Sequence, residues 1–380
     1  MSGWKIPLAI PNVGAEEARA VHDAIMAGDL AIGREQEHFE RFVTDITGAK
    51  FAVSVSSGTA ALHLALLVLG IGPGDTVVVP DLTFIASVNP ISYVGATPVL
   101  IDVKPDSGNI DVDLITTFLE DLQKEQLPLP KAIVAVHLLG EPCDMEGLMS
   151  LSKEYGIDII EDAAESLGAT YGPGSIAYKS TGSIGKIGII SFNGNKVVTT
   201  GGGGMLLTND GALASKARHL STQARLAGNY YNHDVVGYNY RMSNISATLG
   251  IEQLKKLREF ISAKRSIYRH YQDSLELIGD IKMMDTNPEN NGTCWLSTAL
   301  FQDKKTRVKV EAHLRNLGIE CRALWTPIHL QTPYRDSLYI GTGVSSNLAD
   351  CALSLPSSTS LKESEQREVI DVVISTLINH

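Results

Sequence analysis

A single lysine, Lys196, lies in the stretch of the chain whose residues are best suited to covalent chemistry. The apolar run Ile187–Phe192 before it has the length and β-branched content of a buried strand, and a second apolar run, Met205–Leu207, follows. Four consecutive glycines, Gly201–Gly204, permit close approach of a flat ligand. A lysine held near the interior on such a turn favours a Schiff base with a carbonyl cofactor. The alternative is a surface hairpin with a solvated lysine.

Residues that could assist this chemistry follow several predicted strands. Runs of valine, isoleucine and alanine alternate with amphipathic helices, which predicts a parallel sheet covered on both faces. Ligands bind at the carboxyl ends of the strands in such sheets. An acid there could cap a helix or hold a protonated ring nitrogen, and an aromatic residue could belong to the core or stack on a flat ring. The strand ends are Ser56–Thr59, Pro80–Phe84, His137, Glu161–Glu165 and the Lys196 turn.

The segment Ser57–Thr59 opens a predicted helix that runs to about Leu69. Serine and threonine directly before an apolar helix are typical of an N-cap. The glycine between them also exposes backbone amides at the positive end of the helix dipole, a geometry that binds phosphate. A simple cap without a ligand is the alternative.

The composition of the 380-residue chain is ordinary for a soluble globular protein, with 44% hydrophobic and 20% charged residues. The formal net charge is −11 and no lysine- or arginine-rich run occurs, which argues against nucleic acid and anionic membranes as partners. Four scattered cysteines form no C-x-x-C pair, so we expect reduced thiols and no metal site. The first residues lack the pattern of a signal peptide, and we expect a cytoplasmic protein.

The chain is expected to form two domains. The alternation of strands and helices predicts a large domain over residues 1–245. An amphipathic pattern from about Ser246 to Leu277 predicts one long helix that links it to a smaller C-terminal domain within residues 246–380.

Five motifs stand in one order along the chain, and together they resemble those of the DegT/DnrJ/EryC/StrS family of pyridoxal phosphate-dependent sugar aminotransferases. The resemblance covers nearly the whole chain. It implies the α/β fold of the fold-type-I aminotransferases, with a mainly parallel seven-stranded sheet between helices in the large domain and a smaller C-terminal α+β domain. It also implies a homodimer with shared active sites. The motifs are Ser57-Gly-Thr-Ala-Ala-Leu62, Gly72-Pro-Gly-Asp-Thr-Val-Val-Val-Pro80, Glu161-Asp-Ala-Ala-Glu165, Ser191–Met205 and Gly237-Tyr-Asn-Tyr-Arg-Met242.

The resemblance implies a set of residues that bind pyridoxal 5′-phosphate. Lys196 would form the Schiff base, and Asp162 would pair with the pyridinium nitrogen. Glu165 would lie near the oxygen substituent of the ring, and Phe84 would stack on the ring. The phosphate would be bound by Gly58, Thr59 and Ser191, and by Asn239 from the partner subunit.

The resemblance further implies a reaction in which L-glutamate gives its amino group to a nucleotide-linked 4-keto sugar. The segments 220–225, 294–300 and 322–329 look most like the aminotransferases of bacillosamine biosynthesis, which act on UDP-linked 4-keto-6-deoxy-N-acetylglucosamine. A GDP-perosamine synthase is the alternative, and a pyridoxal phosphate-binding regulator without catalysis is a more distant one. Candidate substrate contacts are Arg225, Arg241, Arg322 and His329.

The sequence departs from the family pattern at one position, where Gly202 replaces the usual glutamate. Because Lys196 and the flanking glycines remain, we expect the chemistry to be retained. A related branch of the family has histidine in place of the lysine and dehydrates its substrate, and Lys196 argues against that branch.

Overall fold

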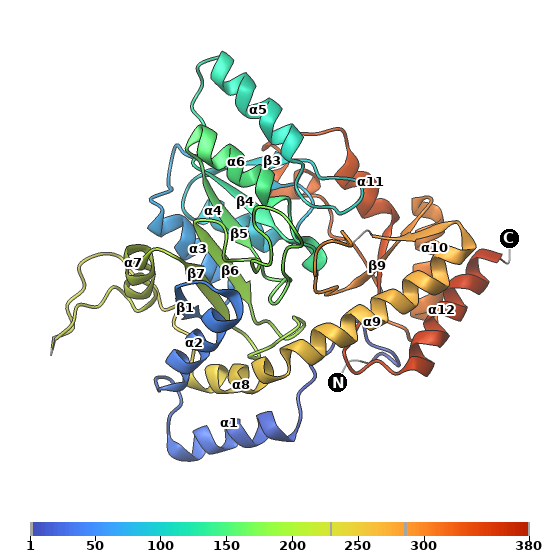
Figure 1. Ribbon diagram of the computed structural model, residues 1–380, viewed down its shortest axis with the longest axis horizontal. Coiled ribbons are helices and arrows are strands. Elements are labelled where there is room, and N and C mark those ends of the chain that lie inside the picture. Colours follow the sequence, from blue (N-terminus) through green and yellow to red (C-terminus); the bar gives the residue numbers. More distant parts are fainter. Residues whose placement is uncertain (1–2, 229, 285–286, 379–380) are drawn as a thin grey trace.

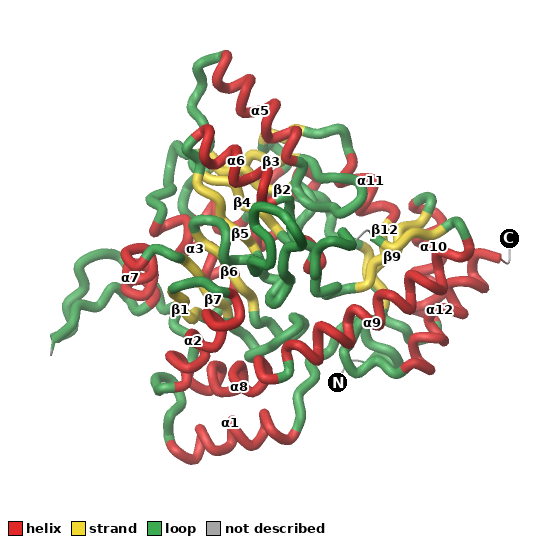
Figure 2. The backbone as a smooth tube through the Cα atoms, viewed as in Figure 1, coloured by secondary structure: helices red, strands yellow, loops and turns green. Residues whose placement is uncertain are grey.

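Short runs of β-branched residues form the centre of the molecule, an eight-stranded sheet in the order β1-β7-β6-β5-β4-β2-β3-β11 (Figures 1 and 2). The computed structural model describes residues 3–228, 230–284 and 287–378. Strand β7 runs antiparallel to both neighbours, and the other pairs are parallel. The strands are β1 (Phe51–Val55), β2 (Thr76–Pro80), β3 (Thr97–Ile101), β4 (Ala132–Val136), β5 (Asp158–Asp162), β6 (Ile187–Ser191), β7 (Gly204–Thr208) and β11 (Leu338–Ile340).

The predicted α/β class and mainly parallel sheet are confirmed, but the sheet has one strand more than the expected seven. The additional strand is β11, which pairs in parallel with β3. It comes from the C-terminal part of the chain and is three residues long, too short for a periodic pattern to reveal it.

Alternate side chains of the strands enter two cores on opposite faces of the sheet. Val77 and Val79 pack with α3 and α7 on one face, whereas Val78 packs with α5 and α6 on the other. The side-chain period of two along a strand produces this division. The second face continues under α2, α8 and the start of α9. The helices of this part are α1 (Ala15–Ala27), α2 (Glu35–Thr47), α3 (Gly58–Val68), α4 (Asn89–Tyr93), α5 (Val112–Lys124), α6 (Met145–Tyr155), α7 (Gly211–Ser221), α8 (Asn244–Lys255) and α9 (Leu257–Leu275).

A small antiparallel sheet in the order β10-β12-β9-β8 forms the second part of the molecule, at the right of Figure 1. Its core is packed with the second half of α9 and with α10 and α12. The elements are β8 (Ile281–Met283), β9 (Ser297–Phe301), α10 (Lys304–Asn316), β10 (Arg322–Ala323), α11 (Val344–Cys351), β12 (Ala352–Leu355) and α12 (Glu363–Ile378).

The expected single helix from about Ser246 to Leu277 is wrong, because it is two helices, α8 and α9. At Lys256 the backbone departs from ideal α-helical angles, with φ at −99° and ψ at 0°, and its amide bonds to the carbonyl of Gln253, three residues back. The apolar stripe continues across this break, so the hydrophobic pattern alone does not reveal it.

The division of the chain at residue 245 stays a prediction, and two segments join the parts across it. Strand β11 completes the large sheet, and near the N-terminus Ile6 pairs with Ile319 beside the small one. None of the helices in the described ranges has both the length and the apolar content needed to cross a membrane. The four cysteine thiols are free and buried.

Asp102, at the end of β3, attaches the C-terminal part of the chain to the large sheet. One carboxylate oxygen accepts the amides of Thr342, Gly343 and Val344 and the hydroxyl of Tyr339, each at 2.9 Å. The other oxygen accepts amides that include that of Ser345 at 2.8 Å. Burial alone would raise the pKa of Asp102, but these hydrogen bonds outweigh it and lower the pKa. The N-terminus of α11 is thereby held against the sheet.

Replacing Asp102 with asparagine should destabilise the protein by about 1–3 kcal/mol, because an amide NH₂ would face backbone donors that it cannot accept. Since the pKa of Asp102 is lowered on folding, its stabilising effect is present above the unfolded pKa of about 3.9 and is lost as the pH falls through the folded pKa. Urea unfolding at pH 7 and at pH 3 measures both effects. Asp113→Asn, at an exposed side chain, is the control. Equal stability of Asp102→Asn and the wild type at pH 7 would contradict this account.

Candidate active site

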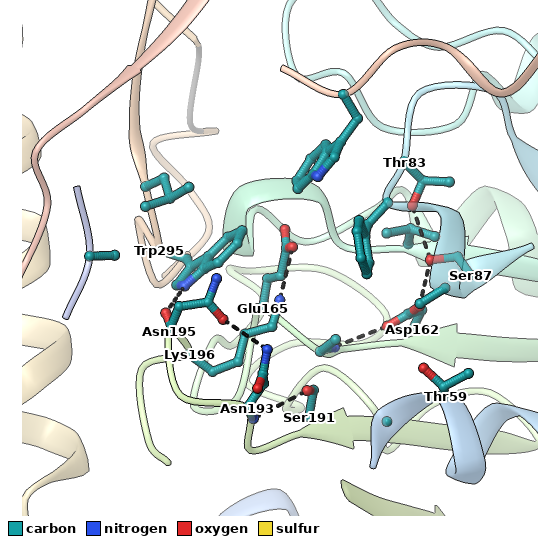
Figure 3. Close-up of a pocket in the computed structure, with 18 of the residues that line it drawn as sticks. Thr59, Thr83, Ser87, Asp162, Glu165, Ser191, Asn193, Asn195, Lys196 and Trp295 are labelled. Atoms are coloured by element: carbon teal, nitrogen blue, oxygen red, sulfur yellow. Dashed lines mark hydrogen bonds and ion pairs between the residues drawn. The ribbon is translucent and has the colours of Figure 1, made fainter. Parts of the chain in front are cut away.

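A cavity of about 550 Å³ opens at the carboxyl ends of the parallel strands (Figure 3). Residues at the ends of β1, β2, β4, β5 and β6 form its floor. The part of the chain around the small antiparallel sheet forms the opposite wall with Trp295, Leu296 and the segment 322–325. The cavity therefore lies where the topology places ligands in parallel sheets, and it has the size of a small-molecule site.

Lys196 lies in this cavity on the turn between β6 and β7, as the sequence predicts. Its Nζ atom is 3.1 Å from Oε1 of Glu165 and 4.0 Å from the centre of the Trp295 ring. The side chains of the ion pair are only 13% and 7% exposed, so the solvated hairpin of the alternative interpretation is excluded. Burial raises the pKa of Glu165, and the charge of Lys196 and the Leu139 amide oppose that rise.

Asp162 lies at the end of β5 on the floor of the same cavity. Oδ2 accepts the hydroxyl of Ser87 at 2.8 Å, and Oδ1 accepts the amide of Ala164 at 3.1 Å. The hydroxyl oxygen of Thr83 lies 3.0 Å from that of Ser87, so the two hydroxyls and the carboxylate form a row of hydrogen bonds (Figure 3). Burial raises the pKa of Asp162 despite these hydrogen bonds. A buried carboxylate with two fixed donors and an open side is suited to hold a cationic N–H group.

The N-terminus of α3 lies at the edge of the cavity. Ser57 caps the helix by accepting the amide of Ala60 at 3.1 Å, which leaves the first-turn amides of Gly58 and Thr59 without an intrahelical acceptor. Packing here is tight: a Cβ atom on Gly58 would be 3.0 Å from that of Ser191, and one on Gly204 would be 2.3 Å from the Ser57 carbonyl. The site can bind a phosphate group through backbone amides and the helix dipole.

The remaining predicted cofactor residue of this chain, Phe84, is half-exposed and lines the cavity. Its ring is 6.4 Å from that of Trp325 in the opposite wall. A flat ligand above Asp162 could pack against Phe84. The structure therefore brings together Gly58, Thr59, Phe84, Asp162, Glu165, Ser191 and Lys196, all in the lining of one cavity.

Asn239, Arg225 and Arg241 are exposed and lie outside this cavity. Arg225 belongs to residues 222–228, which together with residues 230–236 project after α7 at the left of Figure 1. Asn239 pairs with Thr222, and Arg241 pairs with Val55 at the end of β1. Arg225 packs on the ring of Tyr231, with Cζ 4.1 Å from its centre. Their predicted roles require a second subunit and stay predictions.

Of the other two predicted substrate residues, Arg322 lines the cavity and His329 does not. The His329 ring lies 2.6 Å from the buried carboxylate of Asp81 and stacks on Tyr339. The hydroxyl of Ser345 binds the same carboxylate at 2.6 Å. In this arrangement His329 joins the C-terminal segment to the end of β2, and its predicted contact with substrate stays untested.

Sequence reasoning missed three residues of the site. Ser87 holds Asp162, and Trp295 and Trp325 form the aromatic wall, with their rings stacked at 6.4 Å. Trp295 lies two residues before β9, so an aromatic residue close to a strand was the only signal. Ser87 lies in a short turn without any motif.

Comparison with known proteins agrees with this geometry. Residues 11–374 match the DegT/DnrJ/EryC1/StrS aminotransferase family. This chain belongs to that family. EpsN of Bacillus subtilis, whose name places it among pyridoxal phosphate-dependent aminotransferases, is 38% identical over 97% of this chain and 95% of its own length. The GDP-perosamine synthase of Caulobacter vibrioides is 35% identical over 98% of this chain and 99% of its own length. A DegT/DnrJ/EryC1/StrS aminotransferase from Brucella abortus has a similar structure, with a TM-score of 0.88 and 29% identity over 95% of both chains.

The protein is therefore an aminotransferase of fold type I, and its cofactor is pyridoxal phosphate. The residues in the cavity fit this cofactor. Asp162 offers a buried carboxylate for a ring nitrogen, and the α3 N-terminus offers free amides for a phosphate. Lys196 offers an amine in the same cavity, and Phe84 offers an aromatic surface.

Replacing Ser87 with alanine should raise the pKa of Asp162 further, because a hydroxyl that stabilises the carboxylate is lost. If the ionised carboxylate is needed to keep the cofactor ring protonated, the acid limb of the kcat/KM profile should move to higher pH. Profiles of the wild type and Ser87→Ala measure this shift. Ser92→Ala, in α4 and outside the cavity, is the matched control. An acid limb that stays in place in Ser87→Ala would show that Asp162 does not control it.

Proposed function

We propose that the protein transfers the amino group of L-glutamate to C4 of a 4-keto-6-deoxy nucleotide sugar. The proposed substrate is UDP-2-acetamido-2,6-dideoxy-xylo-hexos-4-ulose, and the product is UDP-4-amino-4,6-dideoxy-N-acetylglucosamine. The observation that carries the reaction type is the placement of Lys196 and Asp162 in one cavity beside the N-terminus of α3. The similarity of segments 220–225, 294–300 and 322–329 to bacillosamine aminotransferases supports the sugar.

A GDP-linked 4-keto-6-deoxymannose is the alternative substrate, as in GDP-perosamine synthases. The similarity of the chain to the synthases of Caulobacter vibrioides and Escherichia coli, at 35% and 36% identity, favours this alternative. The two substrates differ in the nucleobase and at C2 of the sugar, so they require different contacts from the residues that line the outer part of the cavity.

Lys196, Asp162 and Glu165 have separate proposed roles in transamination. Pyridoxal phosphate, when bound, supplies a carbonyl that accepts the amino group and a ring that delocalises electrons from the carbon being deprotonated. The Nζ amine of Lys196 moves the proton from the donor α-carbon, first as base and then as acid. The Asp162 carboxylate keeps the ring nitrogen protonated. The Glu165 carboxylate, 3.1 Å away, holds the lysine amine on its side of the cavity.

The charges of the cavity support a homodimer with shared sites. The described lining has two cationic side chains, Lys196 and Arg322, against the carboxylates of Asp162, Glu165 and Glu320. Such a lining cannot balance a phosphate, a dicarboxylic amino acid and a nucleotide diphosphate. The segment 222–241 carries two further arginines and exposed apolar side chains, including Tyr230 and Val236, which are 79% and 82% exposed. A second subunit that buries this segment would bring Arg225, Arg241 and Asn239 to the site.

Replacing Lys196 with alanine should abolish transamination and the visible absorbance of the bound cofactor, because the covalent attachment and the proton carrier are both lost. Absorbance spectra and the conversion of glutamate to 2-oxoglutarate measure the two effects. Arg322→Ala, on the opposite wall, is the control and should keep the visible band. If Lys196→Ala still catalysed transamination and still showed the visible absorbance, the proposal would be refuted. A wild type that binds the cofactor without reacting with glutamate would point to a regulator.

Side-by-side turnover of UDP- and GDP-linked 4-keto-6-deoxy sugars separates the two substrate assignments. We expect a higher kcat/KM for the UDP-linked N-acetylated sugar. A higher value for the GDP-linked sugar would replace the first assignment with the second and leave the reaction type intact.

Mixing two inactive variants tests whether Asn239 acts in the partner's site. In a hybrid of Lys196→Ala and Asn239→Ala subunits, one site would combine an intact Lys196 with an intact Asn239 from the partner. Random exchange makes about half of the dimers hybrid, so activity should recover on mixing. Lys196→Ala mixed with Asp162→Asn is the control and should stay inactive, since both residues line the cavity of the same chain. If Asn239 acted within its own chain, neither mixture would recover activity.

A further inference from the structure

Trp295 contacts the catalytic turn in two ways. Its ring lies under the Lys196 ammonium, with Nζ 4.0 Å from the ring centre. Its indole Nε1–H donates a hydrogen bond of 2.7 Å to the carbonyl of Asn195, the residue directly before the lysine (Figure 3). Trp295 is 3% exposed, and its ring stacks on that of Trp325 with an angle of 9° between the planes. One side chain of the small domain therefore fixes both the backbone of the turn and the end of the lysine.

The backbone beside Trp295 also holds the other partner of Lys196. The amide of Trp295 donates to the carbonyl of Leu139 at 2.9 Å, and the amide of Leu139 donates to Oε2 of Glu165 at 2.8 Å. The hydroxyl of Thr293 donates to the carbonyl of Glu165 at 2.7 Å. Leu139 has a φ of 55°, a conformation that a leucine adopts only where its surroundings impose it. The segment 293–295 thus determines where both members of the Lys196–Glu165 pair lie.

A buried lysine on α9 fixes this segment from behind. Lys264 is 3% exposed and donates hydrogen bonds to the carbonyls of Trp295 at 2.8 Å and Ser357 at 2.9 Å. Burial lowers the pKa of Lys264 to about 8. These two bonds connect α9, the start of β9 and the end of β12, so the position of Trp295 depends on the assembled small domain.

We propose that Trp295 is a positioning residue for Lys196: its indole N–H anchors the turn, and its ring holds the amine beside Glu165 and directed into the cavity. This inference rests on the proposed role of Lys196 and is independent of the sugar. Loss of the N–H should loosen the turn, and loss of the ring should also release the end of the lysine. Trp295→Phe removes the N–H and keeps a smaller aromatic ring, whereas Trp295→Leu removes both the N–H and the aromatic ring.

The test measures how fast Lys196 reacts with pyridoxal phosphate in the protein freed of cofactor, in the absence of any sugar. Each adduct is trapped by borohydride reduction, and its position is read by mass spectrometry. The exposed Lys124 is the internal reference, and the buried Lys264 reports unfolding if it becomes labelled. Since no sugar is present, a role of Trp295 in substrate contact does not affect the result.

We expect labelling of Lys196 relative to Lys124 to slow roughly two- to tenfold in Trp295→Phe. In Trp295→Leu it should slow roughly tenfold or more, because the cation–π contact is also lost. Trp4→Phe is the matched control, since Trp4 packs near Arg315, outside the cavity lining, and its replacement should leave the ratio unchanged.

Equal labelling of Lys196 in the wild type and in Trp295→Phe and Trp295→Leu, with Lys264 protected, would overturn the inference and leave the proposed function intact. If Lys264 becomes labelled in Trp295→Leu, that variant has unfolded, and the labelling of Lys196 in Trp295→Phe alone tests the inference. A wild type in which Lys196 reacts no faster than Lys124 would overturn the proposed role of Lys196, and the inference with it.

Discussion

Burial of the Asp162 carboxylate at the end of β5 is the constraint on which the rest of the site depends. A charge removed from water is unfavourable unless hydrogen bonds or an opposite charge compensate it. Ser87 and Ala164 compensate part of this cost, and the pKa of Asp162 is still raised. In the proposed role of Asp162, a protonated ring nitrogen of the cofactor would supply the missing cation. The same burial that makes the charged carboxylate unfavourable would therefore favour the protonated form of a ring bound beside it.

The parallel sheet explains why the other cofactor groups lie within reach of Asp162. Strands β1, β5 and β6 run in the same direction, with the antiparallel β7 between β1 and β6, so their carboxyl ends lie at one edge and the residues after them face a common space. The antiparallel strand β7 returns the chain beside β6, and its close packing against the Ser57 carbonyl leaves room for no side chain at Gly204. Gly202 differs in that a Cβ atom there would meet no atom within 4 Å. Space therefore does not explain why glycine replaces the usual glutamate at position 202.

Residues beside the small antiparallel sheet contribute side chains to the site and do not only cover it. Trp295 and Trp325 form a wall opposite the sheet, and Arg322 contributes the only cation on that side of the described lining. Asp102 and Asp81, at the ends of β3 and β2, hold the C-terminal segment in place through α11 and His329. The reactive lysine is thus supported from two directions, by its own strand turn and by residues that follow about 100 positions later in the chain.

The sequence by itself predicted the cofactor, because five motifs in one order resemble those of a single family and local patterns indicated where the cofactor's partners lie. A helix cap at Ser57, an acid at a strand end and a lysine before four glycines are each readable within a few residues, and parallel pairing brings strand ends to one edge. Only the tertiary structure decided that Ser87 supports Asp162, that His329 binds Asp81, and that Trp295 lies over Lys196. These contacts join segments that lie far apart in the sequence, and no periodic pattern of residues indicates them. The physical reason is that local spacing encodes strands, helices and caps, whereas the partners of a buried charge are set by how complete elements pack.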